Sequence, residues 1–374
     1  MTARARRRDD SAEIKGLLQA RVKSVVAQLI PGALDRKWAT GRMTQPPFPP
    51  GRRPGTFTIW LDAERAGAWK DYATADKGDI IGLVNFVHGR PRNDAFAWKW
   101  ARDFLGLSAM APSERAAAAE AARLAAARLE RQAASRRAGR VRRAAGFFYE
   151  SMALEEGALG WIYLTSRQCS PDDVPQLERT SFRYRPSLEW WKGAEHDDEG
   201  RKVKEGPRFP ALVSALRDEH GHVTAVHCTF VARHGIGKAP VDKAKLVFGE
   251  VEGAVIRVSK GPTGLTPEEH AADGAEPGVL VVTEGIEDAL TLAIDLPDAR
   301  VWAAFSLGNL MHVPVWHPCV ASVIVAADND WAAPQAADQL ERALDHLRLA
   351  DKPVSVMRAP APFKDFNDWK RGIA

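Results

Sequence analysis

The chain has 374 residues, 27% of them charged, and a net charge of +4 at neutral pH, which leaves room for two or three domains with cores of their own. No apolar stretch reaches the ~20 residues that a membrane-spanning helix requires, and the three cysteines are too few and too far apart for a disulfide framework or a CxxC zinc site. These features exclude membrane proteins and disulfide-stabilised secreted domains, and they predict a cytoplasmic protein with reduced thiols.

The first part of the chain mixes helix and strand patterns. Apolar residues in 11–29 recur on one face of a helix, whereas residues 56–61 alternate as a strand does, and residues 69–72 are interpreted as its hairpin partner. Asp79 stands where the N-cap of a following helix belongs. The sequence therefore predicts a small α+β domain over residues 1–110.

Residues 111–146 are rich in alanine and arginine and contain few large apolar residues. This composition favours a long helix with little to bury, so we interpret it as a helical linker. Its arginines far outnumber its acidic residues. Two readings stay open: a solvated linker, or an arm that contacts phosphates.

Two further domains are predicted after the linker. Within residues 147–277, the strand-like runs 211–217 and 223–230 are joined by Asp-Glu-His-Gly, which indicates a hairpin in a mixed α+β subdomain. From residue 278 to 374, short apolar runs alternate with helical patterns. That alternation predicts a parallel sheet with right-handed crossover connections and helices on its faces.

Carboxylates follow the predicted strands of this last domain. Glu284 and Asp288 come after the run 279–283, Asp328 and Asp330 come after the run 322–327, and Asp365 follows the final strand. Because the carboxyl ends of parallel strands meet at one edge, we expect these side chains to share a crevice. One such aspartate alone is typical of a helix cap, but three clusters exceed that explanation. Converging carboxylates repel each other unless a cation lies between them, and oxygen ligands suit Mg²⁺ or Mn²⁺.

The acidic motifs carry a family resemblance. Val-Thr-Glu-Gly-Ile-Glu-Asp-Ala-Leu followed by Ala-Asp-Asn-Asp resembles the Toprim domain of bacterial-type primases, type IA and II topoisomerases and some nucleases. With the closing Lys-Asp-Phe-Asn-Asp-Trp, it is similar to the Toprim domain of phage and plasmid primase-like proteins. Upstream segments resemble the N-terminal half of a primase catalytic core: residues 163–167, 210–213, 218–227 and 253–257. The resemblance covers about residues 147–374.

The N-terminal domain resembles the zinc-binding domain that precedes this core in bacterial primases, but it lacks the zinc ligands. Residues 1–110 contain no cysteine, and their one histidine is His88. Tetrahedral zinc needs four such ligands, so no zinc is expected. We expect hydrophobic packing to take the place of the metal, using the aromatic residues Trp60, Trp69, Tyr72, Phe86, Trp98 and Trp100.

The resemblance implies an α/β fold, in which a Toprim parallel sheet flanked by helices follows the mixed subdomain and the small N-terminal domain. It implies a DNA-directed primase, a nucleotidyltransferase that makes short RNA primers on single-stranded DNA from nucleoside triphosphates, with Mg²⁺ or Mn²⁺ and a separate replicative helicase as partner. The implied catalytic residues are Glu284, Asp328 and Asp330, with Asp288 and Asp365 as additional metal ligands. Glu284 as a metal ligand and Glu284 as a general base both stay open. The candidate cations for template and triphosphate are Lys245, Arg257, Lys260 and Arg167.

Two other functions share these features. A Toprim nuclease needs the same carboxylates but not the primase-like upstream half. A single-strand-binding replication factor that has lost polymerisation is compatible with the missing zinc ligands. A helicase motor on this chain is not expected, because the sequence contains no GxxxxGK[ST] phosphate-binding loop.

Overall fold

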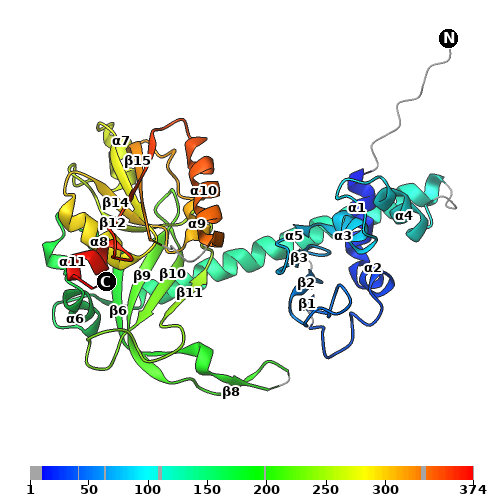
Figure 1. The fold of residues 1–374 in the computed structure, drawn as a ribbon, viewed down its shortest axis with the longest axis horizontal. Helices are drawn as coiled ribbons and strands as arrows, with labels where there is room; N and C mark the ends of the chain where they lie inside the picture. Colours follow the sequence, from blue (N-terminus) through cyan, green and yellow to red (C-terminus); the bar gives the residue numbers. More distant parts are fainter. Residues whose placement is uncertain are drawn as a thin grey trace, which may run out of the picture. The chain divides into compact units, whose positions relative to one another are not determined.

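The computed structural model describes residues 11–40, 42–62, 65–107, 112–197, 199–329 and 334–373. The chain forms two compact units that divide between Arg136 and Arg137. Helix α5 (Pro112–Tyr149), shown in Figure 1, contains the division. Each unit has a hydrophobic core of its own. The four domains predicted from the sequence stay a prediction.

The first unit combines a small sheet with helices. Its strands are paired in the order β1-β2-β3-β4. Its elements are α1 (Ser11–Ala20), α2 (Val22–Leu29), β1 (Met43–Thr44), β2 (Phe57–Trp60), β3 (Trp69–Asp71), β4 (Lys77–Gly78), α3 (Ile80–Val87) and α4 (Phe96–Phe104). The single helix predicted over residues 11–29 is wrong. The chain leaves helical geometry at Arg21 (φ −112°, ψ 25°), although the predicted apolar face is buried on both halves.

Aromatic packing forms the centre of this unit. The Trp69 ring lies 4.3 Å from the Phe86 ring, and Phe57 stacks on Phe86 at 5.6 Å between ring centroids. Tyr72, one of the aromatic residues predicted to pack here, is instead 52% exposed. Asp79 caps α3 as predicted, since its carboxylate accepts a hydrogen bond from the Gly82 amide at 2.9 Å. Rings with offset or tilted contacts contribute stability beyond their buried area.

The second unit begins with an antiparallel sheet, whose strands are paired in the order β11-β10-β9-β6-β5. Its strands are β5 (Met152–Ala153), β6 (Phe182–Glu189), β9 (Arg208–Arg217), β10 (Val223–Phe230) and β11 (Lys245–Gly249). The remaining elements of this part are α6 (Leu159–Ser166), η1 (Pro171–Asp173), η2 (Arg179–Ser181), η3 (Trp191–Gly193), β7 (Glu195–His196) and β8 (Lys202–Lys204). The predicted β9–β10 hairpin is confirmed.

The last turns of α5 belong to this sheet. Ala144 and Phe148 are fully buried in its core. Arg137 and Arg140 both form ion pairs with Glu250, which follows β11. Two arginines of the arginine-rich segment are thus engaged in ion pairs within the chain. Neither of the two readings of the remaining arginines is decided by these contacts.

The C-terminal sheet has the order β12-β14-β13-β15-β16, and all its strands are parallel except β12 at the edge. Its strands are β12 (Ile256–Ser259), β13 (Gly278–Thr283), β14 (Arg300–Ala303), β15 (Val320–Ala327) and β16 (Val354–Arg358). Its helices are α7 (Pro267–Asp273), α8 (Ile286–Asp295), α9 (Leu307–Leu310), α10 (Pro334–Arg348) and α11 (Phe366–Arg371). The predicted fold class, with a parallel sheet flanked by helices, is confirmed.

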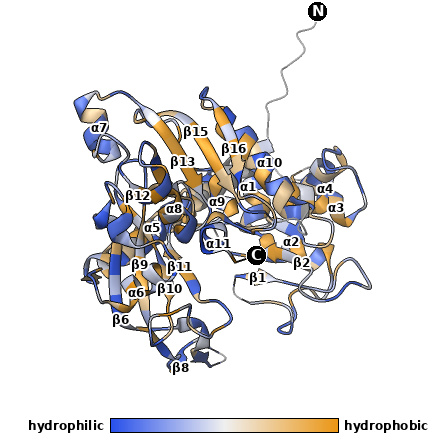
Figure 2. Ribbon diagram, turned by 60° about the vertical axis from the view of Figure 1, so that its left-hand side comes forward, coloured by the Kyte–Doolittle hydropathy of each residue, from blue (hydrophilic) through white to orange (hydrophobic). Residues whose placement is uncertain are grey.

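Alternation along β13 shows why both faces of this sheet are covered. Leu280 and Val282 pack in the cluster formed with α9 and α10, whereas Val281 packs in the cluster formed with α8 and α11. Figure 1 shows α10 on one side of the sheet and α8 and α11 on the other. Figure 2 shows β13 and β15 as hydrophobic strands, which is typical of strands buried on both faces. Within the described ranges, no helix is both long and apolar enough to cross a membrane.

Candidate active site

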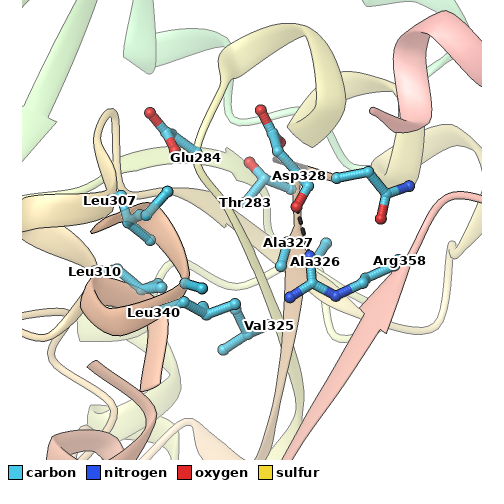
Figure 3. Close-up of a pocket in the computed structure, with 13 residues that line it drawn as sticks. Thr283, Glu284, Leu307, Leu310, Val325, Ala326, Ala327, Asp328, Leu340 and Arg358 are labelled. Atoms are coloured by element: carbon cyan, nitrogen blue, oxygen red, sulfur yellow. Dashed lines mark hydrogen bonds between the residues drawn. The ribbon is translucent and has the colours of Figure 1, made fainter. Parts of the chain in front are cut away.

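The register of the parallel strands brings Glu284 and Asp328 to one edge. Thr283, the last residue of β13, lies opposite Ala326 of β15. Glu284 and Asp328 therefore leave neighbouring strands at the carboxyl end of the sheet, as predicted from the sequence. Figure 3 shows both side chains on the same side of a cavity, with Thr283 between them.

The cavity beside these carboxylates has a volume of about 300 Å³. Apolar side chains from β15, α9 and α10 form most of its wall: Leu307, Leu310, Val325, Ala326, Ala327, Ala336, Ala337 and Leu340. Arg358 also lines it, and its guanidinium donates a hydrogen bond of 2.5 Å to the main-chain oxygen of Asp328. The volume is at the lower end for small-molecule sites in proteins.

Asp288 and Asp365 lie nearby and also hold the local backbone. Asp288 accepts a hydrogen bond from the Asn367 amide at 2.9 Å, and Asp365 is the N-cap of α11, accepting from the Asp368 amide at 2.7 Å. Burial, together with the charges of Asp365, Asp328 and Glu287, raises the pKa of Asp288 to about 8. The carboxylates are therefore close enough to oppose one another's ionisation.

Asn329, between the two aspartates of Ala-Asp-Asn-Asp, has a structural task that the sequence did not reveal. Its side-chain amide donates hydrogen bonds to the main-chain oxygens of Ala359 and Phe363, at 2.8 and 2.9 Å, and its own main-chain amide donates to Lys364 at 2.8 Å. Asn329 thus ties the loop after β15 to the segment that carries Asp365. Asp330, predicted as catalytic, lies outside the described residues.

Two of the four basic side chains predicted to bind template or triphosphate, Lys245 and Arg167, lie at the same end of the sheet as the carboxylates. Lys245 on β11 reaches Glu287 at the start of α8, with Nζ 2.7 Å from Oε2. Arg167 follows α6 and lies 3.7 Å from the Asp368 carboxylate of α11. The side chain of Asn367 also donates a hydrogen bond to the main-chain oxygen of Arg167 at 2.8 Å.

Arg257 and Lys260 lie elsewhere. The Arg257 side chain is 2% exposed and donates two hydrogen bonds of 2.7 Å to Glu268. Strand β12 runs antiparallel to β14, with Ser259 opposite Val301, so Lys260 follows β12 at the opposite edge of the sheet from Glu284. The sequence did not show that β12 is reversed relative to its neighbours. We therefore do not carry these two residues into the proposed nucleotide site.

Glu287, one residue before Asp288, was not predicted. It is 4% exposed and accepts a hydrogen bond of 2.6 Å from the Tyr163 hydroxyl, in addition to its ion pair with Lys245. A second lysine, Lys238, lies 3.8 Å from it. Burial acts to raise the pKa of Glu287, but the charges of the two lysines outweigh it and bring that pKa below its usual range. The available signal was a second carboxylate in the first turn of a helix that is otherwise mostly apolar.

The donor chemistry of this edge fits a divalent cation. The side chains of Glu284, Asp288, Asp328 and Asp365 offer carboxylate oxygens, the ligands that Mg²⁺ and Mn²⁺ prefer. A cation also relieves the like-charge repulsion that, after burial, raises the pKa of Asp288. Within the part of the chain that the structure describes, no group of three or more His, Cys, Asp or Glu side chains is arranged to hold an ion. The set of metal ligands therefore stays a proposal.

Comparison with known families identifies this last domain. The model of the Toprim domain matches residues 279–372. This chain carries a Toprim domain. A second family model, described as a domain of unknown function (DUF7146), matches residues 138–258, which include α6 and the antiparallel sheet. No curated protein matches the chain.

Several solved primase structures are similar to the chain. The Aquifex aeolicus primase, with its zinc-binding and RNA polymerase domains, is 14% identical over 96% of this chain and 82% of that one, with a TM-score of 0.39. The primase catalytic domain of DnaG bound to single-stranded DNA is 19% identical over 61% and 74%, with a TM-score of 0.41. The Escherichia coli primase catalytic core is 16% identical over 61% and 74%, with a TM-score of 0.42. At these values the likeness does not assign an activity to this chain.

Proposed function

We propose that this chain is a primase-like nucleotidyltransferase, which joins ribonucleotides into short primers on single-stranded DNA during phage or plasmid replication. The observation that carries the proposal is the meeting of acidic and basic groups at one edge of the Toprim sheet. Glu284 and Asp328 come from two parallel strands, and Lys245 comes from the preceding antiparallel sheet. Phosphoryl transfer needs both kinds of group, because carboxylates hold the metal cations and basic side chains balance the negative charge of the triphosphate.

The roles of the residues follow from their positions. A divalent cation held by the carboxylates would neutralise the triphosphate and lower the pKa of the attacking 3′-hydroxyl. Glu284 and Asp328, at the cavity, are the proposed ligands, and Glu284 as the acceptor of the hydroxyl proton is the alternative role. Lys245 and Arg167 are proposed to bind the outer phosphates and to stabilise the leaving pyrophosphate. The amino terminus of α8 adds partial positive charge there.

The experiment is primer synthesis on mixed-sequence single-stranded DNA with labelled ribonucleotides, first with Mg²⁺ and then with Mn²⁺. It compares the wild type with Asp328→Ala and with Asp338→Ala, a matched change at an exposed aspartate on α10. We expect short RNA products from the wild type and from Asp338→Ala, and none from Asp328→Ala, with binding of single-stranded DNA equal in all three.

The other results separate the alternatives. If the wild type makes no primers but shortens the template in an Asp328-dependent way, the protein is a Toprim nuclease. If the template stays intact and is bound equally by wild type and variant, the protein is a single-strand-binding factor. Primers made equally well by Asp328→Ala would contradict the proposed site.

A further inference from the structure

The ionic cluster around Glu287 joins two parts of the second unit. Glu287 lies on α8 of the Toprim domain, whereas Tyr163 lies on α6, and Lys238 and Lys245 lie between β10 and the start of β11. The distances to the Glu287 oxygens are 2.6 Å from the Tyr163 hydroxyl, 2.7 Å from Lys245 Nζ and 3.8 Å from Lys238 Nζ. All three partners come from residues matched by the domain of unknown function. Glu287 is thus the acidic centre of a contact between the two domains.

The cluster holds more positive than negative charge. One carboxylate faces two ammonium groups, and the lysine side chains keep exposed fractions of 34% and 41%, whereas that of Glu287 is 5%. His227, also in this cluster, adds no charge, because burial and then the charge of Lys245 lower its pKa to about 3. One positive charge therefore remains at the cluster, on groups that solvent can reach.

The surplus positive charge lies beside the acidic edge of the Toprim sheet, the carboxyl end of its strands, near which Glu284, Asp288, Asp328 and Asp365 lie. A Cβ added to Gly285 would lie 3.1 Å from a carboxylate oxygen of Asp288 and 3.6 Å from one of Glu287, so the two side chains flank the same backbone position. The ammonium groups that contact Glu287 are therefore close to Asp288, one of the carboxylates at the carboxyl end of the sheet. An anion with several phosphates can span such neighbouring positive centres.

The two lysines oppose each other without Glu287. Burial and the charge of Lys245 lower the pKa of Lys238, and Glu287 acts in the opposite direction. If the carboxylate were removed, the ammonium groups would repel each other with no anion between them. Glu287 is what allows two cations to converge there.

We propose that Glu287 is a positioning residue, which holds Lys238 and Lys245 together as one binding site for the triphosphate of the incoming nucleotide. The inference rests on the proposed function and adds a residue of the Toprim domain that acts through lysines of the preceding domain. A buried ion pair that only stabilises the fold needs no second cation. The pair of Arg257 and Glu268 shows the one-to-one arrangement, with two hydrogen bonds of 2.7 Å.

The test measures binding of ATP in the presence of Mg²⁺ to the full chain without template, by calorimetry. We expect Glu287→Gln to weaken binding by about tenfold, as expected for the loss of one charge-assisted contact, and Glu287→Asp to restore part of it. In a chain that already carries Lys238→Met and Lys245→Met, Glu287→Gln should have no further effect. In primer synthesis, the single variant Glu287→Gln should raise the KM for nucleoside triphosphates far more than it lowers kcat.

The matched control is Glu268→Gln, which breaks the ion pair between Arg257 and Glu268. It should lower the thermal unfolding temperature but leave the ATP affinity unchanged. If Glu287→Gln behaves in the same way, Glu287 is structural only and the inference fails. If Glu287→Gln does not fold, Lys238→Met gives the same test. It leaves Lys245 and Glu287 paired one to one, so an unchanged ATP affinity would contradict the inference.

Failure of this inference is distinguishable from failure of the proposed function. Primer synthesis by the wild type, together with a Glu287-independent ATP affinity, rejects the positioning role and keeps the enzyme. A Glu287-dependent ATP affinity without primer synthesis keeps the triphosphate site and rejects the primase.

Discussion

Charged side chains are arranged differently at the two ends of the Toprim sheet: like charges meet at one end, and opposite charges are paired at the other. At the carboxyl ends of β13 and β15, Asp288 is buried and like charges lie close to it, so that its pKa rises to about 8. Near the other end, Arg257 is buried in a bidentate pair with Glu268, which lies between the two capping-box residues, Thr266 and Glu269, at the start of α7. Unrelieved repulsion costs stability and is characteristic of sites that bind something, whereas a satisfied pair serves the fold. We therefore expect changes at the two ends to affect different measurements.

The largest effect is expected from Glu284→Gln. This change keeps the size of the side chain at the cavity but removes its charge, and with it either a metal ligand or the proton acceptor. Primer synthesis should fall by at least about a hundredfold, as for other groups that stabilise charge in a transition state. The rate is measured with labelled ribonucleotides. If Glu284→Gln keeps the wild-type rate, the carboxyl end of the sheet is not the site of primer synthesis, and the functional difference between the two ends is rejected.

Glu268→Gln should act on stability alone. It leaves the Arg257 guanidinium buried without its anion, which costs about 2 kcal/mol of unfolding free energy, less than for a fully enclosed pair because the Glu268 side chain is 38% exposed. Urea unfolding measures this loss. Primer synthesis well below the unfolding transition should stay at the wild-type rate, and a reduced rate would mean that this end also contributes to the site.

Asp288→Asn tests the burial and the like-charge repulsion that together raise the pKa of Asp288. The folded protein binds the Asp288 proton more tightly than the unfolded chain does, so the unfolding free energy falls as the pH rises from the ordinary value of 3.8 towards about 8. Asp365, Asp328 and Glu287 are the charges that face it. Asp288→Asn should lessen this fall by about 1 kcal/mol or more.

The unfolding temperature in EDTA at pH 5.5 and pH 8 checks this expectation. Added Mg²⁺ should then stabilise the wild type more at pH 8 than at pH 5.5, and more than it stabilises Asp288→Asn, because a cation binds the ionised carboxylates. Equal pH dependence in the two proteins would show that the carboxylates at this edge do not repel one another as the structure indicates.

The smallest effect is expected from Lys260→Met. Lys260 follows β12 at the edge opposite Glu284, so its loss should leave both the KM for nucleoside triphosphates and the unfolding free energy at wild-type values. The comparison is Lys245→Met, which should raise KM by about tenfold through loss of a charge-assisted contact. An equal rise in KM for both variants would mean that the two ends share a ligand.

The sequence predicted the acidic edge because its evidence is local. Apolar β-branched runs that stop at Glu284 and Asp328 indicate strands, and parallel strands place their ends together whatever the rest of the chain does. The Asp79 cap and the β9–β10 hairpin were predictable for the same reason, since each depends on residues close in sequence. The break of the first helix at Arg21 was not, because its apolar pattern continues through the break.

The basic half of the site depended on tertiary structure. Lys245, Arg257 and Lys260 are near one another in sequence and look equivalent there, yet the direction of β12 separates Lys260 from Glu284, and the position of α7 encloses Arg257. Glu287 could not be distinguished from a solvated helix residue until Tyr163 and two lysines, from 42 to 124 positions away, were found around it. Sequence alone determined which residues end the strands. Packing alone decided which charges meet, because the energy of a charge depends on neighbours and burial that chain order does not record.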